Sequence, residues 1–316
     1  MDFYVATVAK RPTTDLRRSV QSSTAILIDV QGRYRYHRDH SFAKTVADMS
    51  DEKRYIPAQS QDPIVEVRPD LFLVRGSADV APHLPISRNM VVIRDSGELT
   101  LIGPVRMPPD SEAQLESLGK VARILRIGVH GMDDAYTVER FGCELMCLKG
   151  TEAYHDMPPV SGTFDESSSL PFANARAIRF RGTSISEAAI LWERDGGVLI
   201  TSDALQHYVD WRFFSWPSVL VHKIMGFGAG TIVGPMWHRF LVANETEARK
   251  TFEMLLDLPF THALGLHGGF VEDNAKAAIR AAISREFDEG PAMPDWFYRL
   301  TEKGLRKKLA KFTTWN

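Results

Sequence analysis

The sequence predicts a globular protein of the α+β class, and three features of its 316 residues support this. Short β-branched and apolar runs separated by tight turns recur from about residue 64 onward, which is typical of strands. Other segments repeat apolar residues at the three- to four-residue spacing of an amphipathic helix. Several of the strand-like runs end abruptly in polar residues, which is where sheets with helices around them place ligand sites.

The first regular region lies between Ile64 and Ile102. Its apolar runs are divided by turn residues, among them Asp95-Ser96-Gly97, so we expect antiparallel strands joined by tight turns. A helix is expected next, capped by Asp110 or Ser111 and ending at Gly119. Further elements are expected in order along the chain: strands at 121–127, 177–180, 188–192 and 198–203, and helices at 245–256, 273–287 and 296–311.

The chain divides into three parts by composition. Residues 1–61 are rich in charged and turn-forming residues and predict an N-terminal extension that packs on, or swaps between, copies of the main domain. Residues 62–290 hold the regular strands and helices. Residues 291–316 predict a basic C-terminal helix that packs on the domain.

Charge and cysteine content exclude several classes of protein. The formal net charge is −2, so no overall field favours nucleic acid or an anionic membrane as a partner. The local basic run Gly304–Lys311 is interpreted as a solvated helix face. Cys143 and Cys147 are too few for a disulfide framework and are expected to be small buried side chains. No apolar leader or membrane-length run is present, so a cytoplasmic location is expected.

Three separate strand-like runs end in groups that can ligate a metal. His130 and Asp134 follow the first run, Asp203 follows the second, and His267, held between Leu266 and Gly268, follows the third. Two imidazoles and two carboxylates form a mixed nitrogen and oxygen set that suits zinc, iron or manganese. The same groups could act as a general-base pair, but no serine or cysteine nucleophile lies beside them.

This pattern resembles the metallo-β-lactamase fold over roughly residues 64 to 287. The family's first motif is His-x-His-x-Asp-His, and later motifs are a Gly-Asp step and a His-Gly step. Residue by residue, His130 falls on the first histidine, Asp134 on the motif aspartate, Asp203 on the bridging aspartate and His267 on the final histidine. The resemblance implies a four-layer αββα sandwich, in which two mixed β-sheets pack face to face and helices flank them.

The sequence also departs from the family pattern. Met132 and Ala135 stand where two histidines are expected, and Ser184 is the nearest equivalent of a third. A full two-metal site is therefore not expected. The resemblance instead implies a single metal held by Asp134, Asp203 and His267, with His130 as a base or fourth ligand; His130 and Asp134 are the expected catalytic residues.

Other residues are candidates for supporting roles. Asp133 is expected to cap the following helix or to orient a histidine N–H, and His207, four residues after Asp203, would share its face on a helical turn. Ser184 is a further substitute ligand. Residues that could form a substrate loop or a dimer interface are Trp211, Trp216 and Trp237, which lie in a glycine-rich segment.

The sequence thus predicts a metal-dependent hydrolase that acts on a small molecule with an ester, lactone or phosphoester bond. One alternative is a metal-free binding or assembly module on the same fold. Another is a mononuclear iron redox enzyme, since two histidines with carboxylates also suit that chemistry.

Overall fold

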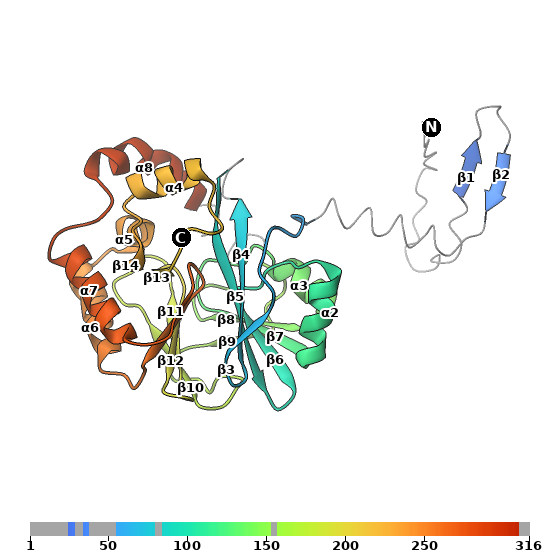
Figure 1. Ribbon diagram of the computed structural model, residues 1–316, viewed down its shortest axis with the longest axis horizontal. Coiled ribbons are helices and arrows are strands. Elements are labelled where there is room, and N and C mark those ends of the chain that lie inside the picture. Colours follow the sequence, from blue (N-terminus) through green and yellow to red (C-terminus); the bar gives the residue numbers. More distant parts are fainter. Residues whose placement is uncertain (1–24, 29–33, 38–54, 80–83, 153–156, 310–316) are drawn as a thin grey trace. The chain divides into compact units, whose positions relative to one another are not determined.

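The computed structural model describes residues 25–28, 34–37, 55–79, 84–152 and 157–309 (Figure 1). The chain divides into two compact units, Met1–Ile56 and Pro57–Asn316. In the first unit, β1 (Ala25–Ile28) pairs antiparallel with β2 (Tyr34–His37). The rest of the predicted extension over 1–54 lies outside the described residues.

The first sheet of the larger unit has seven strands, hydrogen-bonded in chain order. They are β3 (Val65–Arg68), β4 (Leu71–Asp79), β5 (Pro85–Asp95), β6 (Glu98–Ile102), β7 (Lys120–Arg126), β8 (Glu144–Leu148) and β9 (Gly162–Phe164). The strands from β3 to β6 are antiparallel and those from β6 to β9 are parallel. The predicted turn between β5 and β6 is a two-residue hairpin, in which Ser96 and Gly97 both have positive φ, at 53° and 81°.

The second sheet has five strands in the order β10-β11-β12-β15-β16. They are β10 (Ala175–Arg179), β11 (Ala188–Trp192), β12 (Val198–Thr201), β15 (His262–Gly265) and β16 (Phe270–Val271). The central strands β12 and β15 are parallel, and the other pairs are antiparallel. A separate antiparallel pair is formed by β13 (Leu205–Tyr208) and β14 (Gly230–Val233).

Three apolar layers hold the larger unit together. The inner layer lies between the two sheets and joins residues such as Leu73 and Val91 of the first to Ile190 and Leu264 of the second. One outer layer packs α2 (Pro109–Leu118) and α3 (Asp134–Phe141) on the seven-stranded sheet. The other packs α5 (Pro235–Leu241), α6 (Glu245–Leu256) and α7 (Ala275–Phe287) on the five-stranded sheet (Figure 1). The predicted αββα sandwich is confirmed.

The remaining helices are α4 (Trp216–Ile224) and α8 (Asp295–Leu309). The helix at 245–256 has the predicted bounds, but the expected cap of α2 was wrong. This helix begins at Pro109, after Pro108, because the fixed φ of proline suits the first helical position, and Asp110 lies within its first turn. No helix of the described residues has the length and apolar character needed to cross a membrane.

Candidate metal centre

Three of the predicted residues meet at one edge of the sandwich. β12 and β15 are parallel neighbours, so the segments that leave their carboxyl ends, with Asp203 and His267, emerge together. His130 reaches the same place from the other sheet, four residues after β7 ends. Ligand atoms of His130, Asp203 and His267 all lie within 4.8 Å of one another.

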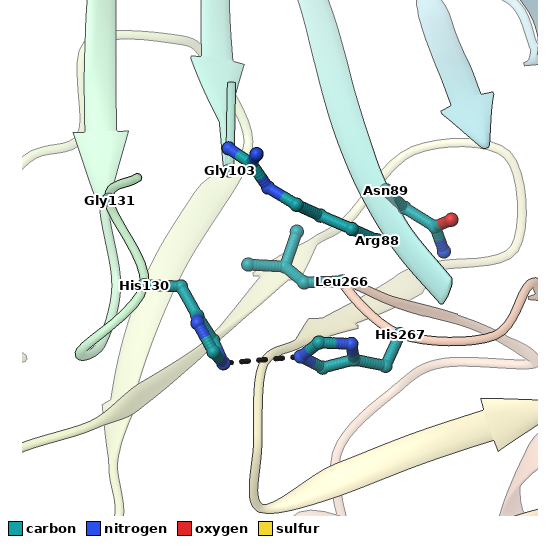
Figure 2. Close-up of a pocket in the computed structure, with 7 residues that line it drawn as sticks. All are labelled: Arg88, Asn89, Gly103, His130, Gly131, Leu266 and His267. Atoms are coloured by element: carbon teal, nitrogen blue, oxygen red, sulfur yellow. Dashed lines mark hydrogen bonds between the residues drawn. The ribbon is translucent and has the colours of Figure 1, made fainter. Parts of the chain in front are cut away.

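The contacts within this group are close. Nε2 of His130 lies 2.7 Å from Oδ1 of Asp203, and Nε2 of His267 lies 3.3 Å from the same oxygen. The two Nε2 atoms are 3.1 Å apart, and Figure 2 shows the imidazoles facing one another. The side chain of His267 is 6% exposed and that of His130 is 43% exposed. His130 is therefore the member of the group that a molecule from solvent meets first.

Strand β5 of the opposite sheet fixes the orientation of His267. Nδ1 of His267 lies 2.6 Å from the Ser87 carbonyl oxygen, which can only accept a hydrogen bond. Nδ1 therefore carries a proton, and Nε2 is the ring atom that faces Asp203 and His130. The Ser87 hydroxyl accepts from Gly268 N–H at 3.0 Å, and Asn89 donates to the Gly265 carbonyl at 2.8 Å. This is how a protein orients a histidine that ligates a metal.

A second buried carboxylate lies beside Asp203. Glu187 is 1% exposed and accepts a hydrogen bond from Ala204 N–H at 2.8 Å. Burial, and then the charge of Asp203, raise the pKa of Glu187 well above its usual value. Burial alone would raise the pKa of Asp203 as well, but the charges and hydrogen bonds of His130 and His267 lower it below its usual value. Asp203 is thus the stronger acid of the pair, and Glu187 holds a proton more readily.

The structure does not bring Asp134 into the group, contrary to its predicted role as a ligand. Its carboxylate is buried and pairs with Arg126, whose Nη1 lies 3.2 Å from Oδ2. Burial raises the pKa of Asp134 to about 6, although Arg126 opposes this. Arg126 also donates to the carbonyls of Gly128 and Val129, at 3.1 and 2.6 Å. The pair therefore shapes the loop that carries His130.

A small pocket opens beside the two histidines. Its lining residues are drawn in Figure 2 and are Arg88, Asn89, Gly103, His130, Gly131, Leu266 and His267. Arg88 donates to Oδ2 of Asp133 at 2.7 Å and to the Pro104 carbonyl. Asp133 was expected to cap the following helix or to orient a histidine. It stands at the N-cap position of α3 without a side-chain capping bond, and its carboxylate holds Arg88 at the pocket wall.

The fold of this molecule occurs among solved structures, although no family model and no curated protein matches the sequence. The metallo-β-lactamase DIM-1 exposed to ceftazidime is 13% identical, with a TM-score of 0.51 over 72% of this chain and 97% of that chain. VMB-1 is 9% identical, with a TM-score of 0.53 over 72% of this chain and 97% of the VMB-1 chain. A metallo-β-lactamase from Pontibacter korlensis is 9% identical, with a TM-score of 0.52 over 72% and 100%.

The chain has the metallo-β-lactamase fold. The family resemblance inferred from His130, Asp203 and His267 is confirmed at the level of the fold, which is what similarity at 6–13% identity shows. Within this metallo-β-lactamase fold, the first motif keeps one histidine in the group of ligand atoms. Met132, in a position where the family has a second histidine, is 47% exposed.

Two further candidates contribute no side chain to the group, although the His207 backbone N–H donates to the His267 carbonyl at 3.2 Å. His207 was expected on a helical turn, but it lies in β13 and its side chain is fully buried. Its Nδ1 lies 3.0 Å from the Thr231 hydroxyl and its Nε2 lies 3.4 Å from that of Thr201. Ser184 donates through its hydroxyl to the Leu241 carbonyl at 3.1 Å, at the end of α5. Both hold the fold together.

The three tryptophans proposed for a substrate loop lie in different environments. Trp237 is 2% exposed and packs against Phe180 and Phe252 in the core beneath α6. Trp211 stacks on Tyr208 at 5.4 Å between ring centroids. Trp216 is 79% exposed on α4. A glycine-rich sequence with aromatic residues does not reveal which rings turn inward.

Burial of His207 predicts a dependence of stability on pH. Burial lowers the pKa of His207 to about 4, from about 6.5 in the unfolded chain. Its contribution to stability is therefore complete above pH 6.5 and is lost as the pH falls towards 4, at a cost of about 3 kcal/mol. Denaturant unfolding between about pH 7 and pH 4 should show this loss, and His207→Asn should reduce it.

Asp134, whose pKa is raised to about 6, acts in the opposite direction over the same range. The effect of His207 is therefore isolated by comparing how steeply the free energy of unfolding changes with pH in the wild-type protein and in His207→Asn. The absolute stability of the variant at neutral pH does not enter this comparison. Equal slopes would contradict the assignment of acid sensitivity to this histidine.

Sequence reasoning missed Glu187, Arg126 and Ser87, and also Arg88 and Asn89 of β5. Glu187 stands directly before the wholly buried strand β11, and an acidic residue in that position was the available signal. Arg126 stands inside an apolar run, which is unusual for a charged residue. Ser87 contributes through its backbone carbonyl, for which the sequence carries no signal.

Proposed function

We propose that this protein is a mononuclear metal-dependent hydrolase that acts on a small molecule with an ester, lactone or phosphoester bond. The observation that supports it most is the convergence of ligand atoms from His130, Asp203 and His267 within 4.8 Å. Three protein ligands that leave a position for water is the composition of a catalytic site. The hydrogen bond from His267 to Ser87 leaves Nε2 free to act as a ligand, so the donor set fits a divalent cation.

A divalent cation bound by these residues would polarise a carbonyl or phosphoryl oxygen and lower the pKa of a water molecule. The residues around it supply the rest. His130 is the most exposed ligand and lies in the pocket wall, where a substrate enters. Arg88, held by Asp133, adds a fixed positive charge to the same wall. That charge favours substrates whose oxygen becomes negative during hydrolysis.

Glu187 and the Asp134–Arg126 pair are buried next to the proposed ligands and stabilise their arrangement. The raised pKa of Glu187 favours its uncharged form next to Asp203, which would leave the group with one carboxylate charge for the cation. Arg126 fixes the carbonyls of Gly128 and Val129 and thereby the approach of His130. A one-zinc form has been solved for the metallo-β-lactamase FIM-1 from Pseudomonas aeruginosa, which has this fold.

Elemental analysis of the purified full-length protein, followed by hydrolysis assays, tests the proposal. We expect about one equivalent of zinc, iron or manganese per chain, and hydrolysis of at least one member of a panel of aryl esters, lactones and phosphoesters that stops on chelation and returns with the metal. Absence of bound metal at saturating zinc, iron and manganese would contradict it and would favour a metal-free binding module. Oxygen-dependent turnover by an iron form would favour a redox enzyme.

A further inference from the structure

Helix α8 presents an unusual face to solvent. Trp296 and Leu300 are one turn apart and are 61% and 76% exposed. Lys303 and Lys307 continue the same face at helical spacing, and both are exposed. The opposite face is the one that packs on the domain, where Tyr298 contacts Phe240 with 5.2 Å between ring centroids. The helix therefore turns a tryptophan, a leucine and two lysines away from the protein.

Helix α4 has a similar exposed face. Trp216, Leu220 and Ile224 follow one another at four-residue spacing, and their exposed fractions are 79%, 53% and 37%. Lys223, beside Ile224, is exposed as well. The buried side of the helix carries Ser218, which donates to the Pro85 carbonyl at 2.6 Å. An exposed row of large apolar residues on a helix marks an interaction surface.

The two helices that carry these faces lie close to one another. The chain leaves α4 through Gly226, and a Cβ atom there would lie 2.5 Å from the carbonyl carbon of Ala292, shortly before α8 begins. Only glycine permits this approach, which brings the end of α4 against the start of α8. Figure 1 shows the two helices together at one end of the larger unit. We call Trp216, Leu220, Ile224, Trp296, Leu300 and the adjacent lysines the α4–α8 face.

The charge of the α4–α8 face indicates its partner. Lys223, Arg299, Lys303 and Lys307 are exposed within or beside it. Helix α8 carries five basic residues against two acidic ones. Of the acidic residues, Asp295 pairs with Arg239, and Glu302 accepts a hydrogen bond from the Tyr298 hydroxyl. A second copy of the chain would bring the same positive charges and repel. Residues 1–54 of this chain are themselves basic. An anionic surface is the complementary partner.

We propose that the α4–α8 face docks the protein on an anionic lipid bilayer. Exposed tryptophan and leucine side chains insert among headgroups, and lysines beside them contact anionic lipids, as in other interfacial helices. The association is peripheral, consistent with the finding that no described helix has the character of a membrane span. The net charge of −2 did not reveal this face, because a sum over the whole chain does not show where basic residues gather.

Vesicle sedimentation of the full-length protein tests this proposal. The vesicles are phosphatidylcholine alone, or phosphatidylcholine with about 30 mol% phosphatidylglycerol. We expect binding to the anionic vesicles and little to the neutral ones, with a strong loss at high salt. Lys303→Glu with Lys307→Glu should weaken binding at least about 25-fold, since each lysine near an anionic surface contributes about fivefold. Trp216→Ser with Leu300→Ser should weaken it at least about tenfold.

Matched control variants distinguish docking through this face from an effect of total protein charge and from unfolding of the variant. Lys120→Glu is the control for charge, since it changes an exposed lysine away from this face. Met254→Ser is the control for apolar contact, since it changes an apolar side chain that is 42% exposed at another site. Neither substitution should change binding to the vesicles. Brominated lipids should quench the fluorescence of the wild-type protein, and Trp216→Phe with Trp296→Phe should remove that quenching. Thermal unfolding should be unaltered in all variants.

Three results would overturn the proposal. The first is an absence of binding to anionic vesicles, and the second is binding that survives both double substitutions. The third is a dimer in sedimentation analysis that Trp216→Ser with Leu300→Ser dissociates, because the face would then lie between two copies of the chain. None of these results depends on the metal centre, so the hydrolase proposal stands or falls separately.

Discussion

Replacement of Asp203 by asparagine is expected to lower metal affinity by well over a hundredfold. Asp203 supplies the only carboxylate among the three ligands within 4.8 Å, and its Oδ1 contacts both histidines. Loss of an outer hydrogen-bond partner already costs a metal site ten- to a hundredfold, and loss of the charged ligand itself costs more. Isothermal titration of zinc into the metal-free protein measures the change.

Stability provides a second measure of the same substitution. Metal at about a hundred times its dissociation constant should stabilise the wild-type protein by about 2.7 kcal/mol, and Asp203→Asn should gain almost nothing. Asp257→Asn, an exposed aspartate just after α6, is the matched control and should bind metal normally. The proposal is contradicted if added metal stabilises neither the wild type nor Asp203→Asn, and Asp203→Asn is the more stable of the two. The loss of a negative charge beside Glu187 would explain that gain in stability, and the protein would then be metal-free.

Replacement of Arg126 by methionine is expected to destabilise the protein by about 3–5 kcal/mol at neutral and alkaline pH. The reason is that Asp134 would be left as a buried carboxylate without a cation. In the wild type the pKa of Asp134 is about 6, above its unfolded value of 3.8, so its contribution to stability is complete below 3.8 and is lost as the pH rises through 6. Without Arg126 the pKa rises further and the loss at neutral pH grows.

The pH dependence distinguishes this effect from lost hydrogen bonds. The deficit of Arg126→Met should shrink as the pH falls to about 5, because Asp134 then binds a proton in the variant. Asp134→Asn added to Arg126→Met should recover part of the stability at pH 8. A deficit of the same size at both pH values would show that Arg126 acts through the carbonyls of Gly128 and Val129 alone.

The family resemblance predicted the sandwich, and the order of apolar runs and polar residues predicted that three ligands meet. His130, Asp203 and His267 each follow an apolar run that is typical of a buried strand, and polar residues that follow neighbouring parallel strands emerge at the same edge of the sheet. The helix at 245–256 was equally clear, since Ala248, Phe252 and Leu255 repeat at helical spacing and all are buried.

The errors have a common physical cause. Asp134 was predicted to be a ligand because its position matches a motif. In the structure its carboxylate pairs with Arg126, a strand residue whose side chain is buried. The sequence does not show whether a charged side chain on a strand points inward or outward. His207 was placed on a helix because residues four apart share a helical face, whereas β13 pairs with β14. Trp237 was assigned to a loop, whereas it lies in α5 and packs against Phe252 of α6.

The origin of the ligands in two different sheets has a mechanical consequence. His130 is attached to the seven-stranded sheet, while Asp203 and His267 belong to the five-stranded one. An ion held by all three would therefore act as a cross-link between the halves of the sandwich, much as a disulfide joins distant segments. Chelation should accelerate amide hydrogen exchange along this edge before elsewhere, and substitutions between the sheets, far from any ligand, should alter the rate of metal release.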